Sequence, residues 1–212
     1  MKHWIFCIIT LFILLAFPPD ALQAGASSSD LTISWSIQVS SKKGGDMELA
    51  ETYNGGVETL FAGDGQARIR LVSLMRIQSI FMSATDNGQK RKFTIIKESG
   101  KDKHVTTLTE DGWKQYNKKY EGAVCKLTED TAGVLNFRCK KAVVTLKDGK
   151  VITAWYTTAI RTPALSDLEP AFTGIPGLVL KYEYTYKKKT ITYTATSISH
   201  APISEDVFKT PA

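Results

Sequence analysis

Residues that could carry out catalysis are few in this chain of 212 residues. The sequence contains no Gly-x-Ser-x-Gly motif and no Cys-His pair at a spacing typical of nucleophilic catalysis. The segment Gly63-Asp64-Gly65 does not continue as a phosphate-binding loop, because Gln66-Ala67-Arg68 leads into a strand. We therefore expect a protein that is not an enzyme.

Acidic residues leave one enzymatic alternative open. Pairs such as Glu48 with Glu51, or Glu129 with Asp130, occur in most sequences by chance. The two carboxylates of a glycosidase, however, cannot be recognised from their spacing in a sequence. A hydrolase with such carboxylates remains an alternative, and acidic side chains gathered in the concavity of the folded chain would support it.

Aromatic side chains on predicted strands are the candidates for a binding site. They could form a concave apolar wall for a lipid, glycan or peptide, and they are Trp155, Tyr156, Tyr182, Tyr184 and Tyr186. The alternative is an ordinary core, because aromatic side chains on strands are usually buried. The last three tyrosines alternate along one strand, and each buried hydroxyl needs a hydrogen-bond partner. This pattern favours a groove that stays partly wet.

Two cysteines, Cys125 and Cys139, follow the N-terminal segment, and their even number predicts a disulfide in an oxidising compartment. Folding a hairpin about residue 132 would place them opposite each other, about 4.5 Å apart at Cα, which is within disulfide range. Two free thiols are the alternative. A metal site would need more ligands than these cysteines and the distant His104 and His200, so we predict neither a metal nor a cofactor.

Alternation of apolar and polar side chains dominates the chain and predicts β-strands, beginning with Leu31, Ile33, Trp35, Ile37 and Val39. Further strands are expected over 47–53, 57–62, 67–73, 75–83, 91–98, 104–109, 141–146, 151–156, 178–187 and 190–200. The helical spacing of Trp113, Tyr116 and Tyr120 predicts a short amphipathic helix. We expect a mainly β protein with a single antiparallel, strongly curved sheet, a half-barrel or bowl, and one or two short helices.

The hairpin turns predict how some strands pair. Asp148-Gly149 is typical of a two-residue hairpin loop, in which Lys147 pairs with Lys150 and Ala142 with Trp155. Asp86-Asn87-Gly88 predicts another hairpin turn. For the turn near 188–189, two loop residues would pair Tyr184 with Tyr193, and three would pair it with Thr192.

The N-terminus predicts export. Lys2 and His3 precede an apolar run from Trp4 to Phe17, and Ala24-Gly25-Ala26 fits a signal-peptidase site. The run has about 14 residues, fewer than the roughly 20 of a membrane span, although a retained anchor is the alternative. We expect a signal peptide at 1–26, one β-rich domain at 27–212 without a further membrane span, and a periplasmic or secreted location.

Charge argues against a nucleic-acid partner. The formal net charge is +6, and short lysine clusters such as 42–43 and 187–189 fall at predicted turns. A nucleic-acid-binding protein would gather basic residues on one face with interleaved aromatic residues. The sequence does not indicate an oligomeric state.

The stretch from Phe137 to Tyr186 carries a family resemblance. It contains Phe-Arg-Cys-Lys-Lys-Ala at 137–142, Ala-Trp-Tyr-Thr at 154–157, and the box Gly174-Ile175-Pro176-Gly177-Leu178 followed by Val179. This order resembles the GLPGLI family of exported bacterial proteins, which is defined by a fold signature and not by known chemistry. The resemblance implies a shape similar to lipoprotein-carrier half-barrels, an open β-bowl around a helix. In the box, Pro176 and Gly177 fit the central positions of a type II turn, which favours a structural role.

Together these patterns predict a non-catalytic exported protein that binds an apolar or amphipathic ligand or an envelope partner. The alternatives are an accessory module for envelope glycan or glycoprotein processing, with tyrosines as stacking platforms, and the carboxylate hydrolase. The candidate partners are therefore a lipid, a glycan or an envelope protein.

Overall fold

The computed structural model describes residues 30–41, 49–83, 90–160 and 165–211, which form one antiparallel sheet of eleven strands. The strands are β1 (Leu31–Ser41), β2 (Val57–Gly63), β3 (Gln66–Val72), β4 (Ile77–Met82), β5 (Lys92–Ser99), β6 (Asp102–Thr109), β7 (Val124–Val134), β8 (Phe137–Thr145), β9 (Val151–Thr157), β10 (Leu178–Tyr186) and β11 (Lys189–Ser199). The predicted signal peptide and the Asp86-Asn87-Gly88 turn lie outside the described residues.

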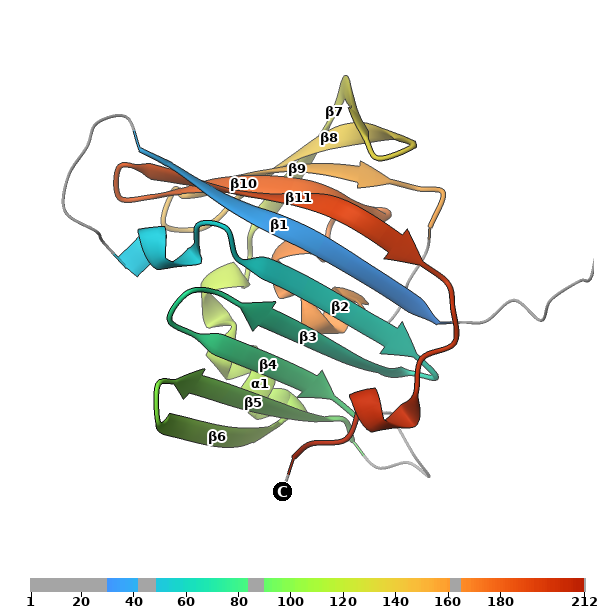
Figure 1. Cartoon of the computed structure of the whole chain (residues 1–212). Coiled ribbons are helices and arrows are strands. Elements are labelled where there is room, and N and C mark those ends of the chain that lie inside the picture. Colours follow the sequence, from blue (N-terminus) through green and yellow to red (C-terminus); the bar gives the residue numbers. More distant parts are fainter. Residues whose placement is uncertain (1–29, 42–48, 84–89, 161–164, 212) are drawn as a thin grey trace, which may run out of the picture.

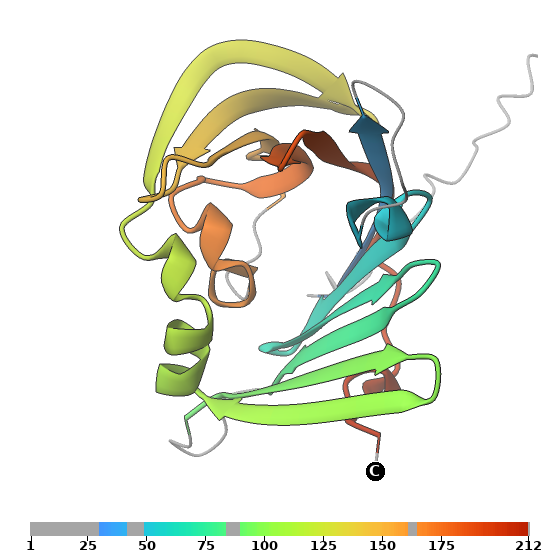
Figure 2. The same ribbon diagram turned by 90° about the vertical axis from the view of Figure 1, so that its left-hand side faces the viewer.

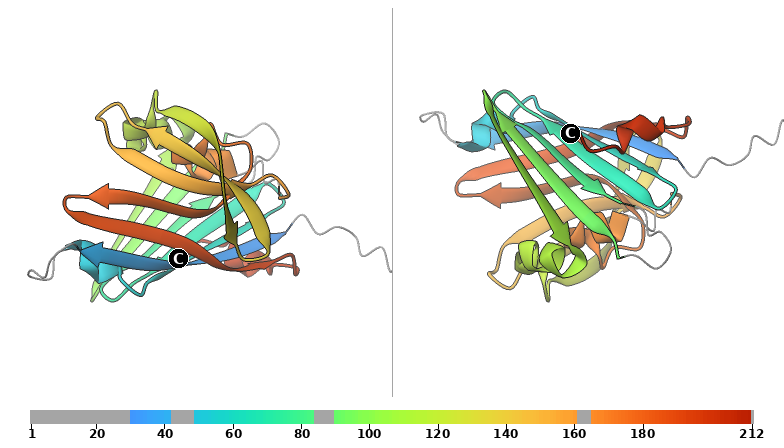
Figure 3. Two further views of the ribbon diagram at one scale, coloured as in Figure 1. Left: turned by 90° about the horizontal axis from the view of Figure 1, so that it is seen from above. Right: turned by 90° about the horizontal axis from the view of Figure 1, so that it is seen from below.

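The sheet is bent into an open C, as Figure 2 shows. Its strand order is β6-β5-β4-β3-β2-β1-β11-β10-β9-β8-β7, so that the first strand pairs with the last and joins the two halves (Figure 1). β6 and β7 form the two free edges, and the views from above and below show the strong twist between them (Figure 3). The predicted fold class, a mainly β protein with a single curved antiparallel sheet, is confirmed.

Short helices close and fill the C. They are η1 (Leu49–Tyr53), α1 (Glu110–Tyr116), η2 (Lys118–Tyr120), α2 (Leu165–Leu168), η3 (Pro170–Phe172) and η4 (Glu205–Val207). α1 runs across the gap between the ends of the C, and α2 and η3 lie inside the concavity (Figure 2). α1 begins where the Thr109 hydroxyl accepts a hydrogen bond from the Gly112 amide, which confirms the predicted helix and satisfies an otherwise unpaired amide. The C-terminal tail packs outside, where Arg68 donates to the Val207 carbonyl.

The core follows the alternation in the sequence. Leu31, Ile33, Trp35 and Ile37 are at most 3% exposed, as predicted for β1. Their neighbours on β2 to β5 continue this apolar face along the inside of the C, because directly paired residues of neighbouring strands share a face. A second buried cluster lies on β8 and β9 and on the segment around η3.

The strand expected over 47–53 is wrong in its described part, since Leu49–Tyr53 forms the 3-10 helix η1. From Ile37 onward, the backbone groups of β1 on the side of β2 form hydrogen bonds with residues 54 and 55 and not with a paired strand. The Ile37 carbonyl accepts from the Gly55 amide, and the Val39 amide donates to the side chain of Asn54. These bonds take the place of the hydrogen bonds that a neighbouring strand would form, so residues 49–53 do not have to pair with β1.

The predicted register of the β8–β9 hairpin is also wrong, by one residue. Ala142 pairs with Ala154, and Trp155 pairs with Lys141. The loop has three residues, 147–149, instead of two, because Gly149 adopts a positive φ of 79°. The Leu146 amide donates to the Lys150 carbonyl, and the Gly149 amide donates to the Leu146 carbonyl, which closes the turn. Trp155 therefore lies on the face opposite to Ala142, half-buried beside the ammonium of Lys181.

The predicted disulfide is wrong: Cys125 and Cys139 are free thiols. Residues 129–133 continue strand β7 instead of turning, and the hairpin turns two residues later, at Leu135 and Asn136. With the bulge between Leu127 and Thr131, Cys139 pairs with Ala132 and Cys125 with Val144.

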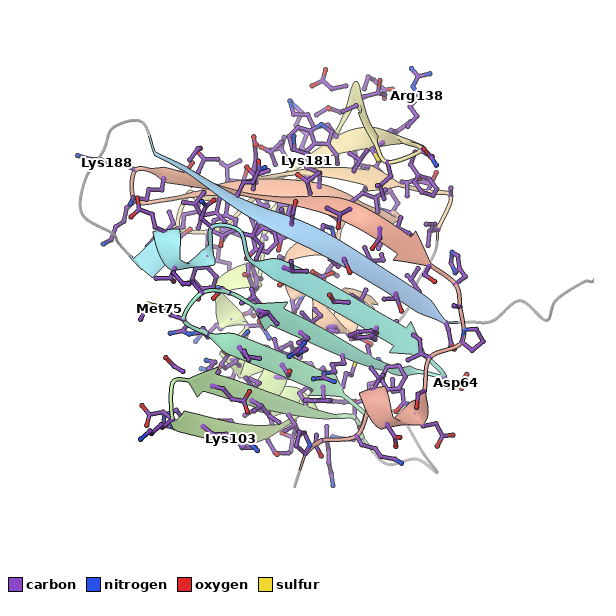
Figure 4. The ribbon with its side chains drawn as sticks, viewed as in Figure 1. Asp64, Met75, Lys103, Arg138, Lys181 and Lys188 are labelled. Atoms are coloured by element: carbon purple, nitrogen blue, oxygen red, sulfur yellow. The ribbon has the colours of Figure 1, made fainter. Side chains whose placement is uncertain are left out.

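The turn between β10 and β11 follows neither expected register. The loop is Lys187-Lys188, one residue earlier than assumed, with Lys187 at a φ of 54°. Tyr184 consequently pairs with Ile191, and Tyr182 pairs with Tyr193. Figure 4 shows Lys188 projecting from this turn, away from the bowl.

Candidate functional site

A cavity of about 970 Å³ lies between α1 and η2 on one side and the segment around η3 on the other. Phe93, Trp113 and Tyr120 contribute aromatic surface to it, and Ala123, Val144 and Ala171 contribute aliphatic surface. Binding pockets for small molecules usually have volumes of about 300–1,000 Å³ and mostly apolar linings. The cavity is therefore large enough to hold a small-molecule ligand.

The walls of the cavity are tied together by Trp113. Its ring stacks on Phe93 of β5 with centroids 4.5 Å apart, and its indole nitrogen donates to the Asp167 carbonyl at 2.8 Å. An ion pair between Arg91, immediately before β5, and Asp167 of α2 joins the other two of these three elements directly. α1, β5 and α2 therefore hold the cavity in a preformed shape.

Charged side chains of both signs surround the apolar part of the cavity. The basic ones are Arg91, Lys114 and Lys118, and the acidic ones are Glu110, Asp111, Glu121 and Asp167. Such a lining suits a ligand with an apolar body and a polar end, because the body is buried while the end reaches the charged rim.

The Gly-Ile-Pro-Gly-Leu box shapes the wall beside η3. A Cβ at Gly174 would lie 2.7 Å from the Cβ of Cys125, and one at Gly177 would lie 2.2 Å from the Thr157 carbonyl oxygen. Because glycine has no Cβ, the backbone at Gly174 can pack against Cys125, and the backbone at Gly177 can pack against Thr157. The predicted type II turn is wrong, since the Gly177 amide donates to the Ile175 carbonyl in a tighter turn around Pro176. Ile175 and Leu178 are buried.

The structure brings three of the five predicted binding residues together, Tyr156, Tyr182 and Tyr184, and separates the other two from them. Tyr156 is buried on the inner face, Tyr182 and Tyr184 are half-buried there, and Tyr186 is exposed at the end of β10. Trp155 lies on the other face of the sheet. None of the five is among the described residues that line the cavity. The sequence pointed to Trp113 and Tyr120 only as parts of a helix, because their partners Phe93 and Ala171 are far away in the chain.

A second cluster, with two carboxyls, lies deeper in the concavity. Glu58 of β2 is paired with buried Trp35 on one side and buried Leu71 on the other, so its side chain shares their inner face. The Tyr182 hydroxyl donates to Glu58 Oε1 at 3.4 Å. Burial raises the pKa of the Glu58 carboxyl to about 7, and the hydrogen bond from Tyr182 opposes this shift.

The second carboxyl belongs to Glu169, immediately before η3. Burial raises its pKa to about 8, and the charge of Glu58 adds to this shift. The two carboxyls therefore lie within electrostatic reach of each other. Part of the surface of each residue remains accessible. The concavity does gather acidic side chains, which is the observation that the hydrolase alternative requires.

Aromatic rings pack beside these carboxyls. Tyr182 stacks on Tyr193 with centroids 4.3 Å apart, and Phe172 of η3 meets Tyr182 edge-on at 5.1 Å. Burial raises the pKa of Tyr184 to about 12 and raises that of Tyr193 further, so both phenols stay protonated at neutral pH. The indole nitrogen of Trp35 is buried and has no hydrogen-bond partner among the described residues.

In the described part of the chain, His, Cys, Asp and Glu side chains do not gather in groups of three that could hold a metal ion. None of the described helices is long and apolar enough to cross a membrane.

Comparison with known proteins adds only distant likenesses. No protein-family model matches the chain, and no curated protein matches its sequence. Among solved structures, PNGF-II is 16% identical with a TM-score of 0.46 over 84% of this chain, which spans only 29% of PNGF-II. The Mycobacterium tuberculosis lipoprotein LppX is 10% identical with a TM-score of 0.31, over 82% of this chain and 88% of LppX. At these values neither likeness says what the chain binds.

Proposed function

We propose that the chain is an exported, non-catalytic binding protein that holds a small amphipathic ligand in the cavity between α1 and η3. The observation that carries this proposal is the cavity of about 970 Å³ itself, with Phe93 and Trp113 in its lining and charges of both signs around it. Because Trp113 is already held by a stacked ring and a hydrogen bond, a ligand would lose little affinity to the ordering of this wall.

Export and membership of the GLPGLI family are parts of the same proposal. They are supported by the apolar N-terminal run and by the Gly-Ile-Pro-Gly-Leu box, whose glycines both meet neighbouring atoms closely. A glycan-processing accessory role is less well supported. The ring of Tyr182 is occupied by Tyr193 and Phe172, which leaves less of it free to stack on a sugar.

The carboxylate hydrolase is the second candidate, because Glu58 and Glu169 are within electrostatic reach of each other in the concavity and have pKa values near those useful to a general acid. Neither residue is among the described residues that line the cavity, which favours binding over catalysis. Hydrolysis of a panel of chromogenic glycosides by the wild-type protein, lost on Glu58→Gln, would reverse this preference.

The binding proposal is tested by narrowing the cavity. Thr173 lines the cavity and is exposed, so Thr173→Phe should fill part of it without disturbing the core. The matched control is Thr185→Phe, an exposed threonine on β10. The probe is N-phenyl-1-naphthylamine, whose fluorescence rises in an apolar site. We expect Thr173→Phe to weaken its binding at least about tenfold, which is 1.4 kcal/mol, and Thr185→Phe to leave it unchanged.

Native mass spectrometry of the protein, purified after export, provides an independent readout. We expect a co-purified small molecule that is lost in the Thr173→Phe variant and kept in Thr185→Phe. A wild-type protein that neither carries a small molecule nor binds the probe would overturn the proposal, as would equal probe binding by the two variants.

A further inference from the structure

Strand β6 is the more open of the two edges of the sheet. It pairs with β5 without interruption from Asp102 to Thr109, and seven of its eight residues are exposed. The other edge strand, β7, carries a bulge between Leu127 and Thr131, a feature that hinders pairing with a further strand. β6, which is described over its whole length, has neither a bulge nor a proline. It is therefore the edge that can accept another strand.

The hairpin loop between β5 and β6 determines which backbone groups of β6 point outward. Gly100, at a φ of 59°, and Lys101 form a two-residue loop, and such a loop is flanked by a hydrogen-bonded pair. Because hydrogen-bonded and non-hydrogen-bonded pairs alternate, every second residue from Lys103 to Thr109 turns its N–H and C=O away from β5. The hydroxyls of Thr94 and Thr107 lie 3.4 Å apart, which fits a non-hydrogen-bonded pair, where side chains are closest. β6 thus presents a row of backbone donors and acceptors to a further strand.

The charges at the two ends of β6 indicate which strand fits this edge. Lys101 and Lys103 lie at its beginning, where Asp102 offsets one of them, and Figure 4 shows Lys103 on β6 at the lower edge of the sheet. Glu110 and Asp111 follow directly after its end, in the first turn of α1. An antiparallel copy of β6 would bring the basic end of one chain beside the acidic end of the other, and opposite charges across strands are stabilising.

Symmetry also favours a second copy of the chain as the partner. Two β6 strands paired about a two-fold axis use the same edge on both chains, so the assembly closes as a dimer. Pairing of β6 with β7 would instead leave a free edge at each end and continue into a fibre. Near the middle of β6, Val105 is 56% exposed, although it pairs with buried Ile96. A second β6 would shield this apolar side chain from water.

We propose that the chain forms a two-fold dimer in which β6 pairs antiparallel with β6 of a second copy, joining two eleven-stranded sheets into one. The residues that turn their backbone groups away from β5, such as Val105 and Thr107, bond to one another about an axis close to Thr106. A single pair of strands covers less than the roughly 1,200–2,000 Å² of a stable interface, so the association is weak, with a dissociation constant of about 10–100 µM.

Sedimentation equilibrium of the purified protein, from about 1 µM to about 500 µM, measures this association. Val105→Lys and Val105→Glu should each weaken self-association at least about tenfold, because like charges then face each other near the axis. A one-to-one mixture of the two variants should associate at least as tightly as the wild-type protein, because opposite charges meet. Association of the mixture also verifies that both variants are folded.

The matched control is Val124→Lys, which changes an exposed valine on the other edge strand, β7, and should leave the dimer unchanged. Amide hydrogen exchange provides an independent readout at the level of single residues. The amides of Val105 and Thr107 should exchange more slowly as the protein concentration rises, because the second copy bonds to them. The amide of Thr106, which faces β5, should exchange at a rate that does not depend on concentration.

A wild-type protein that remains monomeric at the highest concentration overturns the proposal, and so does a monomer that instead takes up an added extended peptide along β6. Equal self-association of Val105→Lys and the wild-type protein, or a mixture of the two charge variants that stays monomeric, has the same consequence. The result does not depend on the ligand cavity, because Val105 is not among the described residues that line it. Both charge variants should therefore bind N-phenyl-1-naphthylamine like the wild-type protein.

Discussion

The stability of the fold should fall as the pH rises, because two carboxyls prefer to be protonated in the folded state. An unfolded glutamate has an ordinary pKa of 4.5, whereas Glu58 has a pKa of about 7 and Glu169 a pKa of about 8 in the fold. Between these values the folded chain binds more protons than the unfolded chain. The free energy of unfolding therefore decreases with pH over this range.

The size of the effect follows from the shifts. One pKa unit corresponds to 1.36 kcal/mol, so the shift of Glu58 is worth about 3 kcal/mol and that of Glu169 about 5 kcal/mol. The coupling between them is already contained in the pKa of Glu169, since the charge of Glu58 is part of its cause, so the two contributions add in the wild-type protein. We expect the wild-type protein to lose about 7 kcal/mol of stability between pH 4.5 and pH 8.5 from this pair, slightly less than the full sum because neither titration is complete within this range.

Guanidinium unfolding at several pH values measures this loss directly. Glu58→Gln and Glu169→Gln should each flatten the pH dependence and be more stable than the wild-type protein at pH 8.5, by about 2 kcal/mol, because an amide carries no charge to bury. Glu183→Gln, the control on the outer face of β10, should follow the wild-type curve. Stability that rises steadily from pH 5 to pH 8, or a pH dependence unchanged in both variants, would refute the reasoning.

Three further outcomes are expected. Lys189→Met should lower the free energy of unfolding by about 1–3 kcal/mol, because the Lys189 side chain is only 8% exposed and its Nζ lies 2.5 Å from Glu51 Oε1. An unchanged denaturant midpoint would contradict a stabilising ion pair. Gly177→Ala should lower the stability by about 2–4 kcal/mol, whereas Gly133→Ala, where a Cβ meets no atom within 4 Å, should cost under about 1 kcal/mol. Alkylation of the unreduced, denatured protein should modify both Cys125 and Cys139, and a mass without added alkyl groups would reveal a disulfide.

Much of the fold could be predicted because most strands are half-buried. The alternation from Leu31 to Val39 requires a strand whatever else the chain does, and the aromatic spacing from Trp113 to Tyr120 requires a helical turn. The prediction of strand register failed where the geometry of a loop decides how the strands pair. A positive φ at Gly149 added one residue to a loop, and this single residue moved Trp155 to the other face of the sheet.

The candidate sites could not be predicted in the same way. Phe93, Trp113 and Ala171 meet only because β5, α1 and the segment around η3 converge, and no short-range pattern records that meeting. Likewise, Glu58 looks like an ordinary strand glutamate until its pairing with Trp35 and the approach of Glu169 place it inside the bowl.

The amino-acid sequence alone determined most of the strands, the short helix, and the bending of one antiparallel sheet, because these depend on periodicity over neighbouring residues. Only the tertiary structure decided the free state of the two thiols, the face on which each aromatic ring lies, and the burial of two carboxyls that are distant in the chain. Those depend on single-residue shifts in loops and on long-range packing, where one extra residue reverses every side chain of a strand and burial changes the pKa of a carboxyl.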